Sequence, residues 1–162
     1  MILLLMGVAG SGKTTIGRLL AKDLGWKFYD ADDFHPPANV AKMAAGHPLD
    51  DHDRAPWLHA LRSRIQKSLT AAEDAVIGCS ALKAAYREVL QPDAAEPIKL
   101  VYLRGSPELL TERLGGRTGH FMKPGMLASQ LATLEEPRDA LVADIALPPG
   151  ELVAFIRKNL GL

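Results

Sequence analysis

The stretch GVAGSGKT at residues 7–14, directly after the apolar run ILLLM at 2–6, decides the fold of this chain. A continuous apolar run that ends in glycine is typical of a strand buried on both faces of a parallel sheet. The eight residues match G-x-x-x-x-G-K-[ST], in which glycines let backbone N–H groups turn toward an anion. The helix expected next presents its positive end to the same anion. The stretch therefore predicts a strand, a loop and a helix that together hold nucleotide phosphates.

The charged and polar end of this motif indicates two separate tasks. Lys13 is expected to reach the β- and γ-phosphates, and the Thr14 hydroxyl to ligate Mg²⁺. Switch GTPases, ATPases and small-molecule kinases all share such a loop, so the loop alone defines no activity. The sequence lacks D-x-x-G and N-K-x-D, which GTPases usually add.

The rest of the chain alternates between predicted strands and predicted helices. The strands are expected at 2–6, 26–30, 75–80, 98–103 and 141–147. The helices are expected at 14–24, 36–46, about 53–70, 82–90, 107–114 and 151–160. This alternation predicts an α/β fold, a three-layer sandwich with a central five-stranded parallel sheet flanked by helices. No stretch is long enough to be a linker, so residues 1–162 are expected to form a single domain.

The glycine-rich stretch GGRTGHFMKPG at 115–125 interrupts this alternation. Its glycines, flanked by Arg113, Arg117 and Lys123, predict a mobile surface segment. Two interpretations stay open: a solvated loop, or a short lid at about 113–125 that closes over a phosphate ligand.

Composition excludes several classes of function. Hydrophobic residues make up 48% and charged residues 23%, as in globular proteins, and the formal net charge is zero, which argues against a general nucleic-acid binder. Cys79 is the single cysteine, so no internal disulfide can form and a reducing compartment is expected. The apolar start is too short for a signal peptide or a membrane span. We therefore expect a cytoplasmic protein.

A cluster of carboxylates follows the second predicted strand in YDADDFHPP at 29–37. Ligands bind at the carboxyl ends of such strands, so Asp30 and Asp32 are expected beside the phosphates, where Mg²⁺ offsets their mutual repulsion. On extended chain, both side chains point to one side. We assign Asp32 to the acceptor hydroxyl and Asp30 to the metal, although the two roles can be exchanged. Asp33 is interpreted as a turn residue.

The sequence resembles gluconokinase of the small P-loop type. The resemblance rests on MGVAGSGKT, DADDFHP, NVAKMAAGHPLDDHDRAPWLHAL, CSALKAAYRE and GHFMKPGMLASQLATLEEP, which span Met6 to Pro137. It implies a P-loop kinase domain similar to shikimate and nucleoside monophosphate kinases. It also implies transfer of phosphate from Mg-ATP to the 6-hydroxyl of D-gluconate, and commonly a homodimer.

The resemblance also implies roles for individual residues. The ATP phosphates and Mg²⁺ would be held by Gly10, Ser11, Gly12, Lys13, Thr14 and Thr15, with Arg117 from the lid. We add Gly7 of the glycine-rich motif and Arg113 of the lid to the expected nucleotide-binding residues. The substrate would be held by Asp32, Arg54, Lys83, Arg87, His120 and Gln130, and the chemistry of a polyol adds His35 as a polar contact. Gly115 and Gly116 stand where relatives often carry bulkier residues, and Leu131-Ala132 where they often have Phe-Glu.

The chemistry of gluconate agrees with part of this set. A small polyol with one carboxylate needs cations, for which Arg is suited to bidentate capture, and polar groups for its hydroxyls. Lys83 and Arg87 are four apart on a predicted helix and should share one face, although a solvated basic face is the plain alternative. For His35 and His120 the alternative is a structural hydrogen bond. Trp57 is expected to anchor its helix in the core.

Two rival functions stay open. One is another small-molecule kinase of the shikimate kinase type, although its F-R-x-x-E motif does not occur here. The other is a nucleotide-binding module without catalysis, since a shared fold does not decide function.

Overall fold

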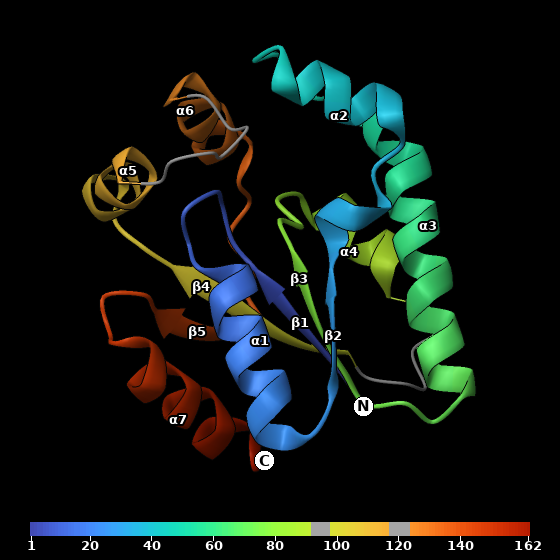
Figure 1. Cartoon of the computed structure of the whole chain (residues 1–162), viewed down its shortest axis with the longest axis vertical. Coiled ribbons are helices and arrows are strands. Elements are labelled where there is room, and N and C mark those ends of the chain that lie inside the picture. The colour runs from blue at the N-terminus through green and yellow to red at the C-terminus, as the bar shows by residue number, and fades with distance from the viewer. Residues whose placement is uncertain (92–97, 117–123) are drawn as a thin grey trace.

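The computed structural model describes residues 1–91, 98–116 and 124–162. Within these residues, five parallel strands form one sheet in the order β2-β3-β1-β4-β5 (Figure 1). The strands are β1 (Ile2–Met6), β2 (Lys27–Asp30), β3 (Ala75–Cys79), β4 (Ile98–Arg104) and β5 (Leu141–Asp144). The strand that leads into the glycine-rich loop is therefore the central one, and Ile2 lies opposite both Ala75 and Ile98.

Helices cover both faces of this sheet. They are α1 (Lys13–Leu24), α2 (Pro37–Ala44), α3 (Asp51–Thr70), α4 (Ala84–Leu90), α5 (Pro107–Gly115), α6 (Pro124–Thr133) and α7 (Pro149–Leu160), with a short 3₁₀ helix η1 (Ala31–Phe34). Figure 1 shows α1 and α7 on one face and α3 with α4 on the other. No helix in the described parts of the chain has the length and apolar character needed to cross a membrane.

The alternation of side chains along β1 explains the three layers. Leu3 and Leu5 pack into the core under α1 and α7, whereas Ile2, Leu4 and Met6 pack into the core under α3 and α4. Successive side chains of a strand point to opposite faces, so an unbroken apolar run supplies both cores at once. The predicted three-layer α/β sandwich with a five-stranded parallel sheet is confirmed.

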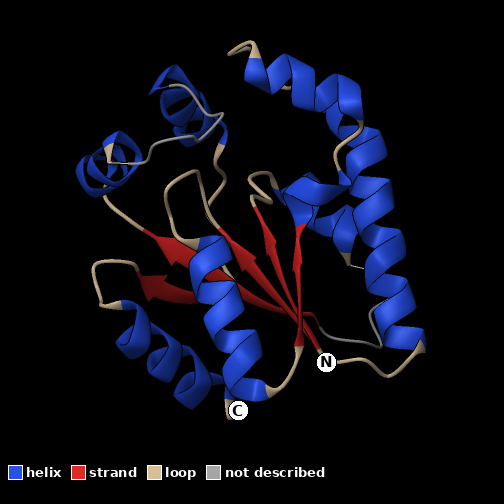
Figure 2. Cartoon of the chain, in the orientation of Figure 1, coloured by secondary structure: helices blue, strands red, loops and turns tan. Residues whose placement is uncertain are grey.

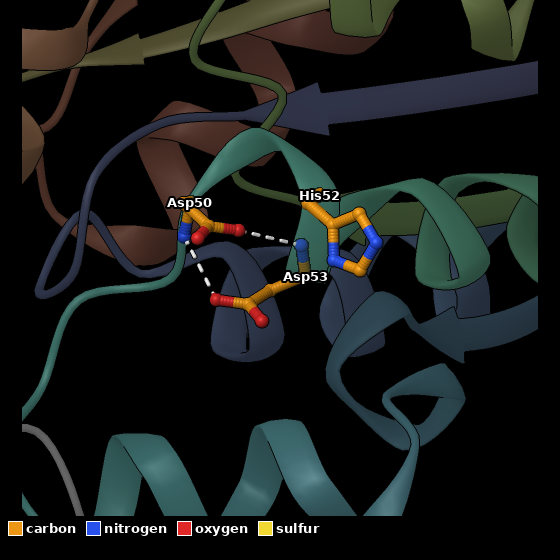
Figure 3. Close-up of side chains that lie close together, drawn as sticks. All are labelled: Asp50, His52 and Asp53. Carbon is orange, nitrogen blue, oxygen red and sulfur yellow. Dashed lines mark hydrogen bonds between the residues drawn. The ribbon is translucent and has the colours of Figure 1, made fainter.

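The start of α3 is fixed by a reciprocal cap (Figure 3). The Asp53 N–H donates to the Asp50 carboxylate at 2.7 Å, and the Asp50 N–H donates to the Asp53 carboxylate at 3.0 Å. Lys42 Nζ of α2 donates to Asp53 at 2.6 Å. Lys42 first, and then the Asp50 N–H, lower the pKa of Asp53 to about 2. His52 lies beside this pair, but the cap and Lys42 already explain why the two carboxylates lie close together.

Several boundaries differ from the predictions by one or two residues, as at α3, which begins at Asp51 rather than at about 53. β5 ends at Asp144 rather than 147, because the Asp144 carboxylate accepts from the Ala146 N–H at 2.9 Å and turns the chain. The helix expected from residue 82 starts at Ala84, with Lys83 as its extended cap. No helix was predicted at α6, whose first two residues, Pro124 and Gly125, belong to the glycine-rich stretch expected to be a loop or a lid.

Candidate active site

A cavity lies at the carboxyl ends of β1, β2 and β3, toward which the strand arrowheads point (Figure 2). Its walls come from the glycine-rich loop, η1, α3 and α6. The predicted site residues among its lining are Gly10, Gly12, Lys13, Thr14, Asp30, Asp32, His35, Arg54 and Gln130. Residues that lie far apart in the sequence thus meet at the edge where open α/β sheets bind ligands.

The glycine-rich loop has the backbone geometry of an anion cradle. Gly12 caps α1 with a left-handed φ of +89°, a conformation that a side chain disfavours. A Cβ on Gly7 would lie 2.9 Å from the Leu103 backbone oxygen, so the close approach of loop and strand requires glycine. Lys13 Nζ donates to the backbone oxygens of Gly7 and Val8 at 2.9 and 3.1 Å, which holds the ammonium inside the loop.

Two further loop residues lie away from the main cavity. Ser11 is buried, and its backbone N–H donates to the Val8 backbone oxygen at 3.2 Å within the loop. Thr15 lines a separate groove on the other side of Gly12, together with Arg113 and Pro149.

The metal-side prediction concerns Thr14 and Asp30, and these two residues are in contact. Thr14 Oγ1 donates to Asp30 Oδ2 at 2.7 Å. The other Asp30 oxygen accepts from the Asp32 N–H at 3.1 Å and caps η1. A hydroxyl and a carboxylate are the hard oxygen donors that Mg²⁺ takes, so the pair fits that ion.

Asp32 reaches the cavity by a different route from the one predicted. The expectation that Asp30 and Asp32 share one side of extended chain is wrong, because the chain turns into η1 after Asp30. Both side chains nevertheless line the cavity, and the Asp32 side chain is 62% exposed. A carboxylate held at the mouth of the phosphate loop can accept a hydrogen bond from an incoming hydroxyl.

His35 lies behind Asp32 with its ring almost fully buried. The ring stacks on Trp57 with centroids 4.5 Å apart, and Asn39 Nδ2 lies 3.3 Å from His35 Nδ1. Burial, and then the charge of Arg54, lower the pKa of His35 to about 4, so the ring is neutral at neutral pH. Trp57 is a core residue, as predicted, and its Nε1 donates to the Ala31 oxygen at 2.7 Å.

A second polar network lies beside the cavity around Tyr86. Arg54 Nη1 donates to the Tyr86 hydroxyl at 3.1 Å, and that hydroxyl donates to the Asp51 carboxylate. Lys83 Nζ donates to the same carboxylate at 3.0 Å. Of the two cations in this network, Arg54 lines the cavity and Lys83 is not among its lining residues.

The predicted pairing of Lys83 with Arg87 on one helical face is wrong, because Lys83 precedes α4. Arg87 Nη1 donates to the backbone oxygens of Ala81 and Leu82 at 2.9 and 3.2 Å and lines a different surface cavity with Glu135. The guanidinium therefore ties α4 to the turn before it.

The remaining predicted residues belong to α5, α6 and the stretch between them. Gln130 Oε1 on α6 accepts from the Ala9 N–H at 2.7 Å, which joins α6 to the phosphate loop. Arg113 Nη2 on α5 donates to the Ile145 oxygen at 2.5 Å. Arg117 and His120 lie outside the described residues.

Sequence reasoning missed three residues that shape the site: Asn39, Asp51 and Tyr86. Only Asn39 left a recognisable signal, since His35 and Asn39 stand four apart in HPPAN, a spacing that brings side chains together at a helix start. Asp51 and Tyr86 meet across 35 residues of sequence, and no local pattern indicates that contact.

The phosphate loop, the acidic residues at the next strand end and the parallel sheet define a P-loop kinase. A family model described as shikimate kinase matches residues 9–147. The gluconokinase of Gluconobacter oxydans is 50% identical over 137 residues, which cover 85% of this chain and 76% of that protein. The chain belongs to the gluconokinase family.

Solved structures agree with this assignment. A gluconokinase from Sinorhizobium meliloti is 41% identical, with a TM-score of 0.83 over 98% of this chain and 94% of that one. A sugar kinase from a Janibacter species, also 41% identical, reaches a TM-score of 0.91 over 99% of this chain and 94% of that one.

Proposed function

We propose that this chain transfers the γ-phosphoryl group of ATP to the 6-hydroxyl of D-gluconate, giving 6-phospho-D-gluconate and ADP. The observation that carries the proposal is that one cavity at the phosphate loop contains both a carboxylate, Asp32, and a cation, Arg54. Relatives named gluconokinase, at 41–50% identity over most of the chain, support gluconate as the acceptor.

Positioning and charge neutralisation supply the chemistry, since phosphoryl transfer needs little covalent work from the protein. Lys13 and the loop N–H groups hold the β- and γ-phosphates. Thr14 and Asp30 would hold Mg²⁺, which would supply positive charge to offset that of the phosphates. Asp32 orients the 6-hydroxyl toward the γ-phosphorus and accepts its proton.

Arg54 receives the gluconate carboxylate, because a guanidinium captures a carboxylate through two parallel hydrogen bonds. Tyr86 holds Arg54 in place. Lys83 serves the substrate only after leaving Asp51, and Arg87 is assigned to the α4 turn rather than to gluconate. Gln130 offers its amide beside the loop for a gluconate hydroxyl.

The nucleotide base is proposed to lie in the groove next to Gly12. Thr15, Arg113, Leu147 and Pro149 line this groove, which begins where the phosphate loop ends. Apolar walls and one guanidinium suit the faces of a purine ring. Residues 113–125 are proposed as a lid that excludes water, with Arg117 on the phosphates and His120 on the substrate.

Location and assembly are proposed on simpler grounds. The one cysteine, Cys79, is buried, and burial raises the pKa of its thiol to about 12, so the chain suits a reducing compartment such as the cytoplasm. A homodimer is proposed from the family resemblance. The mass of the particle in solution, measured by light scattering, tests it.

The decisive experiment measures ADP release from Mg-ATP with purified protein and four acceptor conditions: none, D-gluconate, shikimate and AMP. Release that depends on gluconate alone supports the proposal. Release with shikimate or AMP keeps the kinase but overturns the acceptor. Nucleotide binding without turnover under any condition overturns catalysis on these acceptors and favours a binding module.

A further inference from the structure

We infer that His35 is a positioning residue for the reaction: fixed by Asn39 with its proton on Nε2, it donates a hydrogen bond to Asp32 and so aims that carboxylate at the acceptor hydroxyl. The inference rests on the proposed function, because that function gives Asp32 the acceptor hydroxyl. It concerns a side chain that the sequence offered only as a direct substrate contact or a structural group.

The direction of the chain of hydrogen bonds is fixed at Asn39, which is buried. Its Nδ2 lies 2.8 Å from the Asp53 backbone oxygen, which can only accept, so the amide turns its N–H groups to this side. The same Nδ2 lies 3.3 Å from His35 Nδ1. An NH₂ group has no lone pair to offer, so Nδ1 must accept and the ring proton must be on Nε2.

The ring has little room to move. Its plane is 13° from that of Trp57, and Trp57 is itself anchored to the Ala31 oxygen at 2.7 Å. The His35 side chain is only 4% exposed. Its Nε2 edge therefore keeps one direction, and that direction faces Asp32.

Asp32 is the partner that can adjust. Nε2 lies 4.0 Å from Asp32 Oδ1, which is longer than a hydrogen bond. The Asp32 side chain is 62% exposed, so a small side-chain rotation closes the distance. Catalytic hydrogen bonds are often long before substrate binds and tighten with it. One carboxylate oxygen would then be held by His35, and the carboxylate would be aimed at the 6-hydroxyl.

A neutral imidazole suits this task. Burial and the neighbouring Arg54 keep the ring uncharged, as its low pKa indicates. A neutral N–H orients a carboxylate without pairing it in a full ion pair, so the carboxylate retains its capacity to accept a proton.

Kinetics of two substitutions at this position test the inference. His35→Phe keeps the ring stack on Trp57 but has no donor, and kcat for gluconate is expected to fall roughly 10- to 100-fold, because misplacement of a catalytic group has effects of this size. His35→Gln carries an amide nitrogen the same number of bonds from Cβ as Nε2, and should restore much of kcat. KM for ATP should change little in either. His59→Gln, at an exposed position of α3, is the matched control.

Equal losses in His35→Phe and His35→Gln, or no loss in either, would overturn the inference, since a purely structural histidine is not rescued by a donor.

Nitrogen NMR of histidine-labelled protein tests the inference without turnover. The His35 proton should be on Nε2, and its resonance should shift in Asp32→Ala but not in Asp33→Ala, the exposed neighbour. A proton on Nδ1, or no response to Asp32→Ala, overturns the inference even in an active enzyme. If the spectrum is as expected but the protein does not turn over gluconate, the proposed function is overturned while the contact between His35 and Asp32 is retained.

Discussion

The two halves of the cavity are built in different ways. The phosphate half consists of the eight consecutive residues 7–14, which follow β1 and include the first two residues of α1. Its Lys13 donates to backbone oxygens only five and six residues away. The acceptor half is assembled from η1, α2, α3 and α6, and α4 supports it from outside the cavity through the bond between Arg54 and Tyr86. Its contacts join Asn39 to Asp53 and Tyr86 to Asp51.

This difference separates what each half contributes. The phosphate half carries chemistry common to many proteins, because backbone N–H groups bind any phosphate. The acceptor half carries the choice of substrate, because side chains from separate helices must fit one set of hydroxyls and one carboxylate. Substitutions in the two halves should therefore have separable effects on nucleotide and on acceptor.

The largest separable effect is expected at Asp32. Asp32→Asn removes the group that accepts the hydroxyl proton, so kcat with gluconate should fall about 10²- to 10⁴-fold. Nucleotide affinity, measured by calorimetry, should stay near the wild-type value. Asp33→Asn is the control, and near-normal turnover of a folded Asp32→Asn protein would falsify the assignment.

Lys13→Met should break the phosphate half instead. Loss of the Lys13 positive charge beside the transferring phosphoryl group is expected to lower kcat roughly 10²- to 10³-fold and to weaken ATP binding as well. The same calorimetry and ADP-release assay measure both quantities. Lys22→Met, at an exposed position of the same helix, controls for charge. Unchanged ATP affinity would contradict the assignment of Lys13 to the phosphates.

Arg54→Gln should sharpen the comparison on the acceptor side. A charged hydrogen bond contributes about 1.5–3 kcal/mol, so KM for gluconate should rise about 10- to 100-fold, with KM for ATP little changed. Steady-state kinetics with each substrate varied in turn measure this. Arg62→Gln, on the same helix and bonded to the Val89 oxygen, is the control. A rise in KM for ATP alone would contradict the carboxylate role.

The acceptor half should also respond to pH through His35. Its pKa is about 4 in the folded chain and near 6.5 when unfolded, so the unfolded chain binds a proton first as pH falls. The free energy of unfolding should therefore decrease from pH 6.5 down to about 4, and His35→Phe should flatten that decrease. Urea unfolding at several pH values measures it. An identical pH dependence in the wild-type and His35→Phe proteins would show that His35 does not cause the loss of stability at low pH.

The smallest effect is expected at the cap of α3, which presents Arg54 to the cavity. Asp50→Ala should lower the free energy of unfolding by about 1 kcal/mol, because an N-cap acceptor is lost. Asp50→Asn keeps an acceptor and should be close to wild type. Equal losses in the two variants, seen in thermal unfolding, would assign the effect to charge rather than to capping.

The same contrast explains how much the sequence could predict. GVAGSGKT and the apolar run before it indicated the loop and a strand buried on both faces, and the alternation of strands and helices indicated the three layers, because all of these follow from local patterns. The acidic residues were predicted at the correct edge of the sheet, although Asp32 lies on η1 rather than on extended chain.

The errors arose where a side chain meets a distant partner or where local turns end an element. Arg87 turned to the oxygens of Ala81 and Leu82, a choice that spacing on a helix does not reveal. Helix α6 follows glycines that favour a loop, so the sequence predicted neither the helix nor the hydrogen bond from the Ala9 N–H to Gln130.

The central position of β1 has a consequence for how the chain folds as it is synthesised. β1 is the earliest strand in this sequence, yet its two neighbours are β3, from residue 75, and β4, from residue 98. During translation the apolar segment ILLLM must therefore remain without strand partners while some seventy residues are added. Folds dominated by such distant pairings form slowly and expose aggregation-prone segments on the way. The buried strand that positions the phosphate loop is thus also an apolar segment exposed to aggregation until its neighbouring strands have been made.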